Sequence, residues 1–287
     1  MPNDAIYMKK KTICIAAMAG QSSWDTYWEN ALQRTNPNLG VHTERTIGGM
    51  VAAGISKRMN ILAGLPYIST KNSAGNLQDQ HGLQDLSIHL KYKLVDHAGF
   101  TVSGVLGGSI PASNYVAEFL PMSIGVHSKN LIGRAIFNYH TPGGLYSTLQ
   151  GGYTMRSHIK IDKDAYQAND QVYYSNEVAI PDVADASIRI GMLKKTWQAE
   201  LFYETNQCVS GDYIRRNDMP FPTNQMKMNA AGAYLKYQPS QLGGIVRFAK
   251  VLSGVNAGQS TMIMAGVLFQ FSVGSHEMNH PIKMEKQ

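Results

Sequence analysis

The stretch Leu83-Gln-Asp-Leu-Ser-Ile-His-Leu-Lys-Tyr-Lys-Leu94 decides the fold, because apolar and polar side chains alternate along it. The apolar set is Leu86, Ile88, Leu90, Tyr92 and Leu94, and the polar set is Asp85, Ser87, His89, Lys91 and Lys93. A period of two places these sets on opposite faces of a strand, whereas a helix would mix them. The apolar face either packs on a second sheet, as in a soluble sandwich, or faces lipid in a barrel with a wet lumen.

The composition favours the barrel. Only 16% of the 287 residues are charged, fewer than the roughly one quarter of soluble domains, yet the mean hydropathy is -0.22. The apolar run at residues 262–269 is much shorter than the roughly 20 residues of a membrane-spanning helix.

The net charge is +6, but the basic residues are scattered, so we expect no nucleic-acid partner. Cys14 and Cys208 are too few for a disulfide framework, and we expect both to be free.

Residues 8–19, Met-Lys-Lys-Lys-Thr-Ile-Cys-Ile-Ala-Ala-Met-Ala, imitate a signal peptide, with a basic start and a small-residue end. Their apolar part is short, and Asp4 precedes it. Ile13, Ile15, Ala17 and Ala19 also share one face of a strand. We therefore interpret this segment as the first barrel strand and expect the export signal to be missing from the chain.

Twelve segments fit the alternating pattern, and short turns and long loops separate them in turn. They are residues 11–20, 42–56, 59–70, 83–94, 99–110, 130–140, 145–156, 184–193, 197–206, 225–237, 243–253 and 259–271. This rhythm is typical of outer-membrane barrels, which have tight periplasmic turns and long extracellular loops. We predict an all-β fold, a transmembrane up-and-down antiparallel β-barrel of about 12 strands in the cell outer membrane. It would comprise residues 1–271, and residues 272–287 would form a periplasmic tail.

Two further features belong to this prediction. Residues 111–129 are assigned to a long loop, and folding of this loop into the lumen is one alternative. Five aromatic residues on lipid-facing parities are expected to form part of the interfacial girdles, namely Tyr92, Tyr139, Tyr153, Trp197 and Tyr203.

Motifs for catalysis or cofactor binding are weak. His276-Glu-Met-Asn-His280 fits a zinc-protease pattern, but it lies in the predicted tail directly before Pro281, so we expect only adventitious metal binding. No nucleophile elbow, phosphate-binding glycine loop or Cys-x-x-Cys pair occurs, and we expect no cofactor and no catalytic residues. Ser69 and Ser147 fall on lipid-facing parities, but we assign no histidine partner to either.

Polar residues on the lumen parity carry both signs of charge: Glu44, Asp85, His89, Arg134, Asn138, Arg156, Arg189, Glu200, Glu204 and Arg247. Either they fill the lumen with ion pairs, or some of them line a substrate path. Pro66 lacks an N–H group inside a strand, which predicts a bulge or kink. The alternative is a gap in the wall through which an apolar ligand leaves sideways.

Short motifs resemble a known family. They are Trp24-Asp-Thr-Tyr-Trp-Glu29, Leu65-Pro-Tyr67, Gly82-Leu-Gln-Asp-Leu86, Met122-Ser-Ile-Gly125 and Pro222-Thr-Asn224. The chain from about residue 4 to 271 is similar to outer-membrane transporters grouped with the meta-pathway phenol-degradation proteins, especially their Bacteroidetes-type members. The resemblance implies an outer-membrane barrel that passes small, often apolar or aromatic, molecules. It supplies no binding residues, and the tail after Phe271 departs from the family's usual ending.

The main functional hypothesis is a transport barrel for such molecules, with aromatic side chains holding the solute and Pro66 near an exit. The predicted path comprises Trp24, Trp28, Pro66, Tyr67, Asp85, His89, Arg134, Arg189, Glu200, Glu204 and Arg247. A non-conducting barrel that scaffolds a larger outer-membrane complex is the alternative, and an outer-membrane hydrolase is the third hypothesis. Expected partners are membrane lipid, lipopolysaccharide, a small-molecule solute and other outer-membrane proteins.

Overall fold

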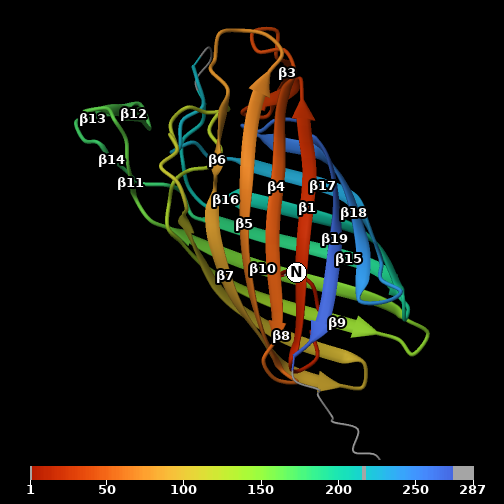
Figure 1. The fold of residues 1–287 in the computed structure, drawn as a ribbon. Helices are drawn as coiled ribbons and strands as arrows, with labels where there is room; N and C mark the ends of the chain where they lie inside the picture. The colour runs from red at the N-terminus through yellow and green to blue at the C-terminus, as the bar shows by residue number, and fades with distance from the viewer. Residues whose placement is uncertain (1, 215–217, 274–287) are drawn as a thin grey trace, which may run out of the picture.

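The fold is a closed antiparallel β-barrel, seen in a computed structural model that describes residues 2–214 and 218–273 (Figure 1). Its sheet has 13 strands, of which all but the four-residue β6 (Gln80–Leu83) are long. The long strands are β1 (Thr12–Trp24), β4 (His42–Gly54), β5 (Met59–Asn72), β7 (Asp85–His97), β8 (Phe100–Pro111), β9 (Asn130–His140), β10 (Leu145–Arg156), β15 (Val183–Leu193), β16 (Trp197–Cys208), β17 (Lys227–Tyr237), β18 (Leu242–Val255) and β19 (Thr261–Ser272). The sheet closes on itself because β4 pairs with β5 as well as with β1.

The predicted fold class and strand positions are confirmed. β9 and β10 agree with the prediction to the residue, and the first strand runs four residues further, to Trp24. The segment that imitates a signal peptide is therefore mostly a wall strand, paired along its length with β4 and β19. Cys14 and Cys208 are free, as expected.

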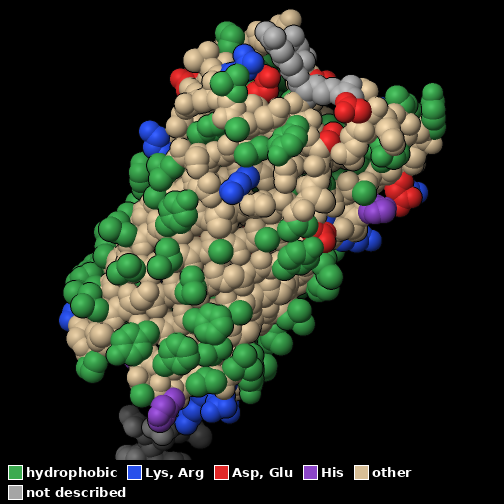
Figure 2. Space-filling model, turned by 180° about the vertical axis from the view of Figure 1, so that it is seen from behind, with side chains coloured by type: hydrophobic (Ala, Val, Ile, Leu, Met, Phe, Trp, Pro, Cys, Tyr) green, Lys and Arg blue, Asp and Glu red, His purple; other side chains and the backbone are tan. Residues whose placement is uncertain are grey.

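The outer face of the barrel is apolar. Leu201 is 69% exposed and Ile88 is 54% exposed, whereas the inward-pointing Lys91 and Arg189 are 1% and 3% exposed. Figure 2 shows hydrophobic side chains spread over the wall, with most charged side chains near its two ends. The five predicted girdle aromatics are likewise exposed on the outer surface. This distribution suits a wall that faces lipid and encloses a polar lumen.

Small strands occur in loops that the sequence did not mark as ordered. The first long loop contains the hairpin of β2 (Thr26–Glu29) and β3 (Leu32–Thr35). The loop after β10 contains two further pairs, β11 (Ile159–Lys160) with β14 (Glu177–Val178) and β12 (Tyr166–Ala168) with β13 (Gln171–Tyr173). The loop after β10 packs on the loop after β8 through a small apolar cluster around Ala117, Ile159 and Val178.

Two predictions, the metal-binding motif and the C-terminal tail, concern residues near the end of the chain. The His276 to His280 motif and most of the predicted tail lie outside the described residues, so the domain division stays a prediction. Among residues 2–214 and 218–273, no cluster of three or more metal-ligating side chains occurs. The same part of the chain contains no helix with the length and hydrophobicity needed to cross a membrane.

Candidate solute site in the barrel lumen

The N-terminal segment, residues 2–7, turns into the lumen as a plug, and Lys91 holds it there. Lys91 Nζ donates hydrogen bonds to Asp4 Oδ1 at 2.9 Å, to the Ile6 carbonyl at 3.0 Å and to the Asp4 carbonyl. The same ammonium lies 4.7 Å from the ring centroid of Tyr7. Residues 4–6 accordingly lie within the barrel. The sequence prediction missed this plug.

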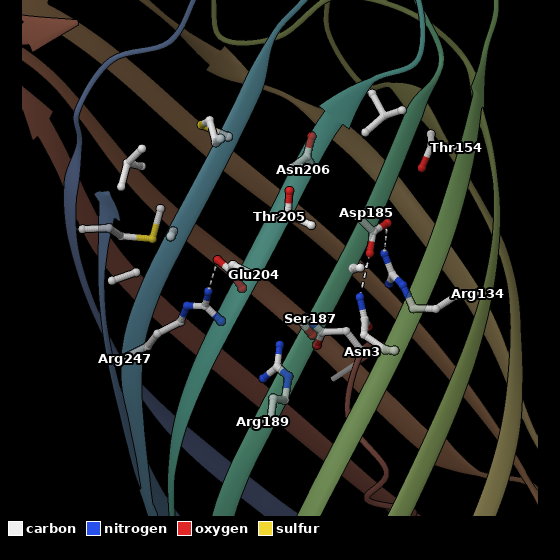
Figure 3. A pocket seen from close by; sticks show the side chains of 18 of the residues that line it. Asn3, Arg134, Thr154, Asp185, Ser187, Arg189, Glu204, Thr205, Asn206 and Arg247 are labelled. Carbon is white, nitrogen blue, oxygen red and sulfur yellow. Dashed lines mark hydrogen bonds and ion pairs between the residues drawn. The ribbon is translucent and has the colours of Figure 1, made fainter. Parts of the chain in front are cut away.

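An upper cavity of about 430 Å³ lies in the lumen among β9, β10 and β15 to β19. Two ion pairs lie along its wall, and each joins two strands that have one strand between them: Arg134 Nη2 lies 2.9 Å from Asp185 Oδ1, and Arg247 Nη2 lies 2.6 Å from Glu204 Oε1. Figure 3 shows these pairs, with Arg189 pointing into the same space. Asn3 from the N-terminal segment contributes to the lining as well.

A lower cavity of about 540 Å³ lies between the N-terminal segment and the wall, nearer the short turns. Arg189 lines both cavities, and its Nη1 lies 2.9 Å from Glu200 Oε1. Each of these two side chains is only 3% exposed. The other oxygen of Glu200 accepts hydrogen bonds from Tyr146 and Gln198. Arg189, paired with Glu200, therefore lies between the two cavities.

Among the predicted path residues, those with ionisable side chains on the lumen parity face the lumen. Arg189, Glu200, Arg134, Glu204 and Arg247 meet in the ion pairs above. The predicted lumen residues outside this path also point inward: Asn138 accepts a hydrogen bond from Thr148 at 2.7 Å, and Arg156 lines the upper cavity. Glu44 is half-buried.

Asp85 and His89 lie on the opposite wall. His89 is buried, and Asp85 accepts a hydrogen bond from the Tyr115 hydroxyl at 2.6 Å. Burial and the adjacent Asp85 carboxylate both raise the pKa of Tyr115, so its hydroxyl stays a donor. This contact ties the loop after β8 to the rim of the barrel.

The same loop, residues 112–129, folds inward, which is the option that the sequence left open. The Thr70 hydroxyl donates to the Met122 carbonyl at 2.6 Å, and Gln84 Nε2 donates to the Ile124 carbonyl at 2.6 Å. Met122 is completely buried. The loop therefore narrows the extracellular end on the side of β5 and β7.

Pro66 marks an interruption of the wall. β5 pairs with β7 only as far as Gly64 opposite Ser87, and from Tyr67 onward it pairs with β6, with the register moved by one residue. Between these two ladders, the Gln84 N–H donates to the Pro66 carbonyl at 2.9 Å. The predicted bulge is confirmed, because a proline without an N–H group lies where one ladder stops and the next begins.

The predicted aromatic residues divide between two places. Trp28, in the β2–β3 hairpin, is buried against Ala230 and Val251 at the extracellular mouth of the lumen, and Trp24 packs on His42 with ring centroids 5.2 Å apart. Tyr67 is different: its ring lies on the outer surface, 42% exposed. The expectation that Tyr67 holds solute inside the lumen was therefore wrong, since its side chain has the lipid-facing parity of β5.

The hydrolase hypothesis required a lipid-facing serine beside a histidine. Ser69 lies directly opposite His81 in the β5–β6 ladder, a neighbour that the sequence analysis did not assign. Within the described part of the chain, no hydrogen bond joins these two side chains. The pair thus lacks the nucleophile–base contact that such catalysis requires.

Several lumen residues were missed. Phe202 is buried with its ring 4.2 Å from the Arg247 guanidinium carbon, although an apolar residue breaks the alternation of β16. Asp185, Tyr146 and Lys91 do lie on the polar parities of their strands. That parity was the available signal, but it does not say which side chains meet.

Solved structures with the same fold include the COG4313 outer membrane channel from Pseudomonas putida F1, with a TM-score of 0.73 at 12% identity over 94% of this chain and 99% of that one. The translocator domain of the autotransporter NalP from Neisseria meningitidis matches with a TM-score of 0.55 at 12% identity, over 94% of this chain and 91% of that one. No family model and no curated protein matches the chain. The likeness shows that the chain has the fold of outer-membrane barrels. Membership of the phenol-degradation group stays a prediction.

Proposed function

We propose that the protein is an outer-membrane channel for small, apolar or aromatic molecules. The observation that carries this proposal is the pair of lumen cavities, of about 430 and 540 Å³, on either side of Arg189. Small-molecule sites commonly have about this size. A barrel that served only as a scaffold would have no need of such spaces.

The proposed path begins at the extracellular mouth, beside Trp24 and Trp28. Solute then occupies the upper cavity and moves past the N-terminal segment, either down through the lower cavity or sideways near Pro66. The change of register between the β5–β7 and β5–β6 ladders supports the sideways route, because Pro66 has no N–H group to donate there. Tyr67, on the outer surface beside this break, would meet the leaving solute.

The test is the initial rate of uptake of radiolabelled toluene, at limiting concentration, by Gram-negative cells with and without the barrel. Heat-modifiable migration on gels and surface labelling establish that the barrel is folded and inserted. We expect faster uptake in cells that contain it. Equal rates at verified expression would contradict the proposal and favour the scaffold alternative.

A further inference from the structure

The guanidinium of Arg189 has one edge with no protein partner. Its Nη1 forms the ion pair with Glu200. Within the described residues, Nε and Nη2 have no hydrogen-bond acceptor, although the side chain is only 3% exposed. A buried donor without an acceptor is costly and uncommon. Nε and Nη2 share one edge of the guanidinium fork, and such an edge binds carboxylates in a bidentate manner.

The surroundings of Arg189 favour an anion. Four arginines line the upper cavity, Arg134, Arg156, Arg189 and Arg247, against the two carboxylates Asp185 and Glu204. If Glu200 is counted as the partner of Arg189, these four arginines face three carboxylates, which leaves one excess positive charge. Arg134 Nε also has no acceptor among the described residues.

The cavity wall away from Arg134, Arg156 and Arg189 is apolar apart from Arg247 and Ser260. β17, β18 and β19 contribute the side chains of Met228, Ala230, Ala249, Val251 and Met262. Phe202 lies directly opposite Arg189 across the β15–β16 ladder, with its ring between Arg189 and Arg247. A ligand with an acidic group at one end and a hydrocarbon body at the other would match both walls.

We infer that the upper cavity is a binding site for a small amphipathic monocarboxylate, with the carboxylate on the Nε and Nη2 edge of Arg189 and the hydrocarbon body against β17 to β19. This inference rests on the proposed channel function and narrows its solute class to aromatic molecules that carry a carboxylate. The ion pairs with Asp185 and Glu204 hold Arg134 and Arg247 in position at the cavity.

The test is calorimetric titration of the purified barrel, in nonionic detergent, with benzoate, benzyl alcohol and acetate. Benzyl alcohol keeps the ring without the charge, and acetate keeps the charge without the ring. We expect benzoate to bind roughly tenfold or more tightly than either, because charge-assisted bidentate bonds and apolar burial both contribute. Equal binding of benzoate and benzyl alcohol would overturn the inference.

Two variants locate the site. Arg189→Lys keeps the charge and a partner for Glu200 but lacks the planar edge, and we expect a roughly tenfold loss of benzoate affinity. The double variant Arg189→Gln with Glu200→Gln keeps the net lumen charge and should lose the same preference. Arg58→Gln, in the exposed turn after β4, is the matched control and should bind as the unaltered protein does. Unchanged benzoate affinity in a folded Arg189→Lys variant contradicts the assignment.

Failure of this inference is distinguishable from failure of the channel proposal. If toluene uptake depends on the barrel but benzoate is not preferred, only the carboxylate site is wrong. If benzoate binds through Arg189 but the barrel does not accelerate uptake, the site stands and the channel proposal is wrong.

Discussion

Lys91 Nζ lies 2.9 Å from Asp4 Oδ1, and this ion pair joins the N-terminal segment to the wall of the lumen. β7 supplies the lysine, whose side chain is 1% exposed, and the segment supplies the carboxylate together with two backbone carbonyls. One side chain thus makes three polar contacts to residues 4–6. Whether the N-terminal segment blocks the lumen can therefore be tested by replacing Lys91.

Replacing Lys91 by Met should release the segment. Loss of one partner of a buried ion pair costs about 3–5 kcal/mol, which changes the ratio of docked to undocked segment by roughly a hundredfold or more. We expect a higher single-channel conductance in planar bilayers. Lys250→Met, on the exposed face of β18, is the control and should conduct like the unaltered protein. Equal conductance of all three proteins would show that Lys91 does not govern passage.

Pro66→Val should close the break in the wall. Valine restores an N–H group and favours strand geometry, so β5 gains the means to pair continuously with its neighbour. If solute leaves sideways, toluene uptake falls severalfold while ion conductance through the lumen is unchanged. Pro142→Val, in the turn between β9 and β10, serves as the control. Unaltered uptake by the Pro66 variant would exclude the sideways route.

Leu201→Arg tests the orientation of the wall. Leu201 is 69% exposed near the middle of β16, and an arginine at the lipid midplane costs about 2–4 kcal/mol. We expect a lower guanidinium midpoint of unfolding in lipid vesicles. Leu32→Arg, 59% exposed in the β2–β3 hairpin outside the barrel sheet, should have little effect. The lipid-facing assignment fails if both variants unfold at the same denaturant concentration.

Gly107→Ala tests the packing of the lumen. A Cβ atom at Gly107 would lie 2.2 Å from His89 Nδ1 and 2.8 Å from the Ile88 carbonyl oxygen, so the backbone or the imidazole must move. Such overpacking costs about 1–3 kcal/mol. Gly133→Ala, whose Cβ would have no atom within 4 Å, is the matched control. The measurement is the temperature of the gel-shift transition, and equal values for both variants would contradict the packing at His89.

The alternation of side chains was sufficient to predict the barrel, because inside and outside environments differ along every strand. β9 and β10 could be placed to the residue, since a Thr-Pro-Gly-Gly turn bounds one end and a long polar loop the other. Pro66 was interpreted correctly because a missing N–H group has a direct consequence in a ladder. The hairpin of β2 and β3 was missed, since strands of four residues carry too short a pattern.

The site was predicted less completely for physical reasons. Parity showed that Arg189 and Glu200 face the lumen, but their pairing depends on the register between β15 and β16, which sequence alone does not fix. Phe202 was missed because an apolar side chain on the polar parity looks like an irregularity until Arg247 is placed over it. The plug was missed because residues 2–7 have no period, and nothing local indicates that Asp4 meets a lysine 87 positions away.

The most direct test of a solute path through the lumen is to block it chemically. Asn206 lines the upper cavity and points into it (Figure 3). In a background with Cys14 and Cys208 replaced by alanine, Asn206→Cys is coupled to a bulky thiol reagent in intact cells, and toluene uptake is measured. The control couples the same reagent to Tyr203→Cys, on the outer face of β16. We expect uptake to fall to the level of cells without the barrel only when residue 206 is blocked, whereas undiminished uptake after complete labelling there would contradict passage through the lumen.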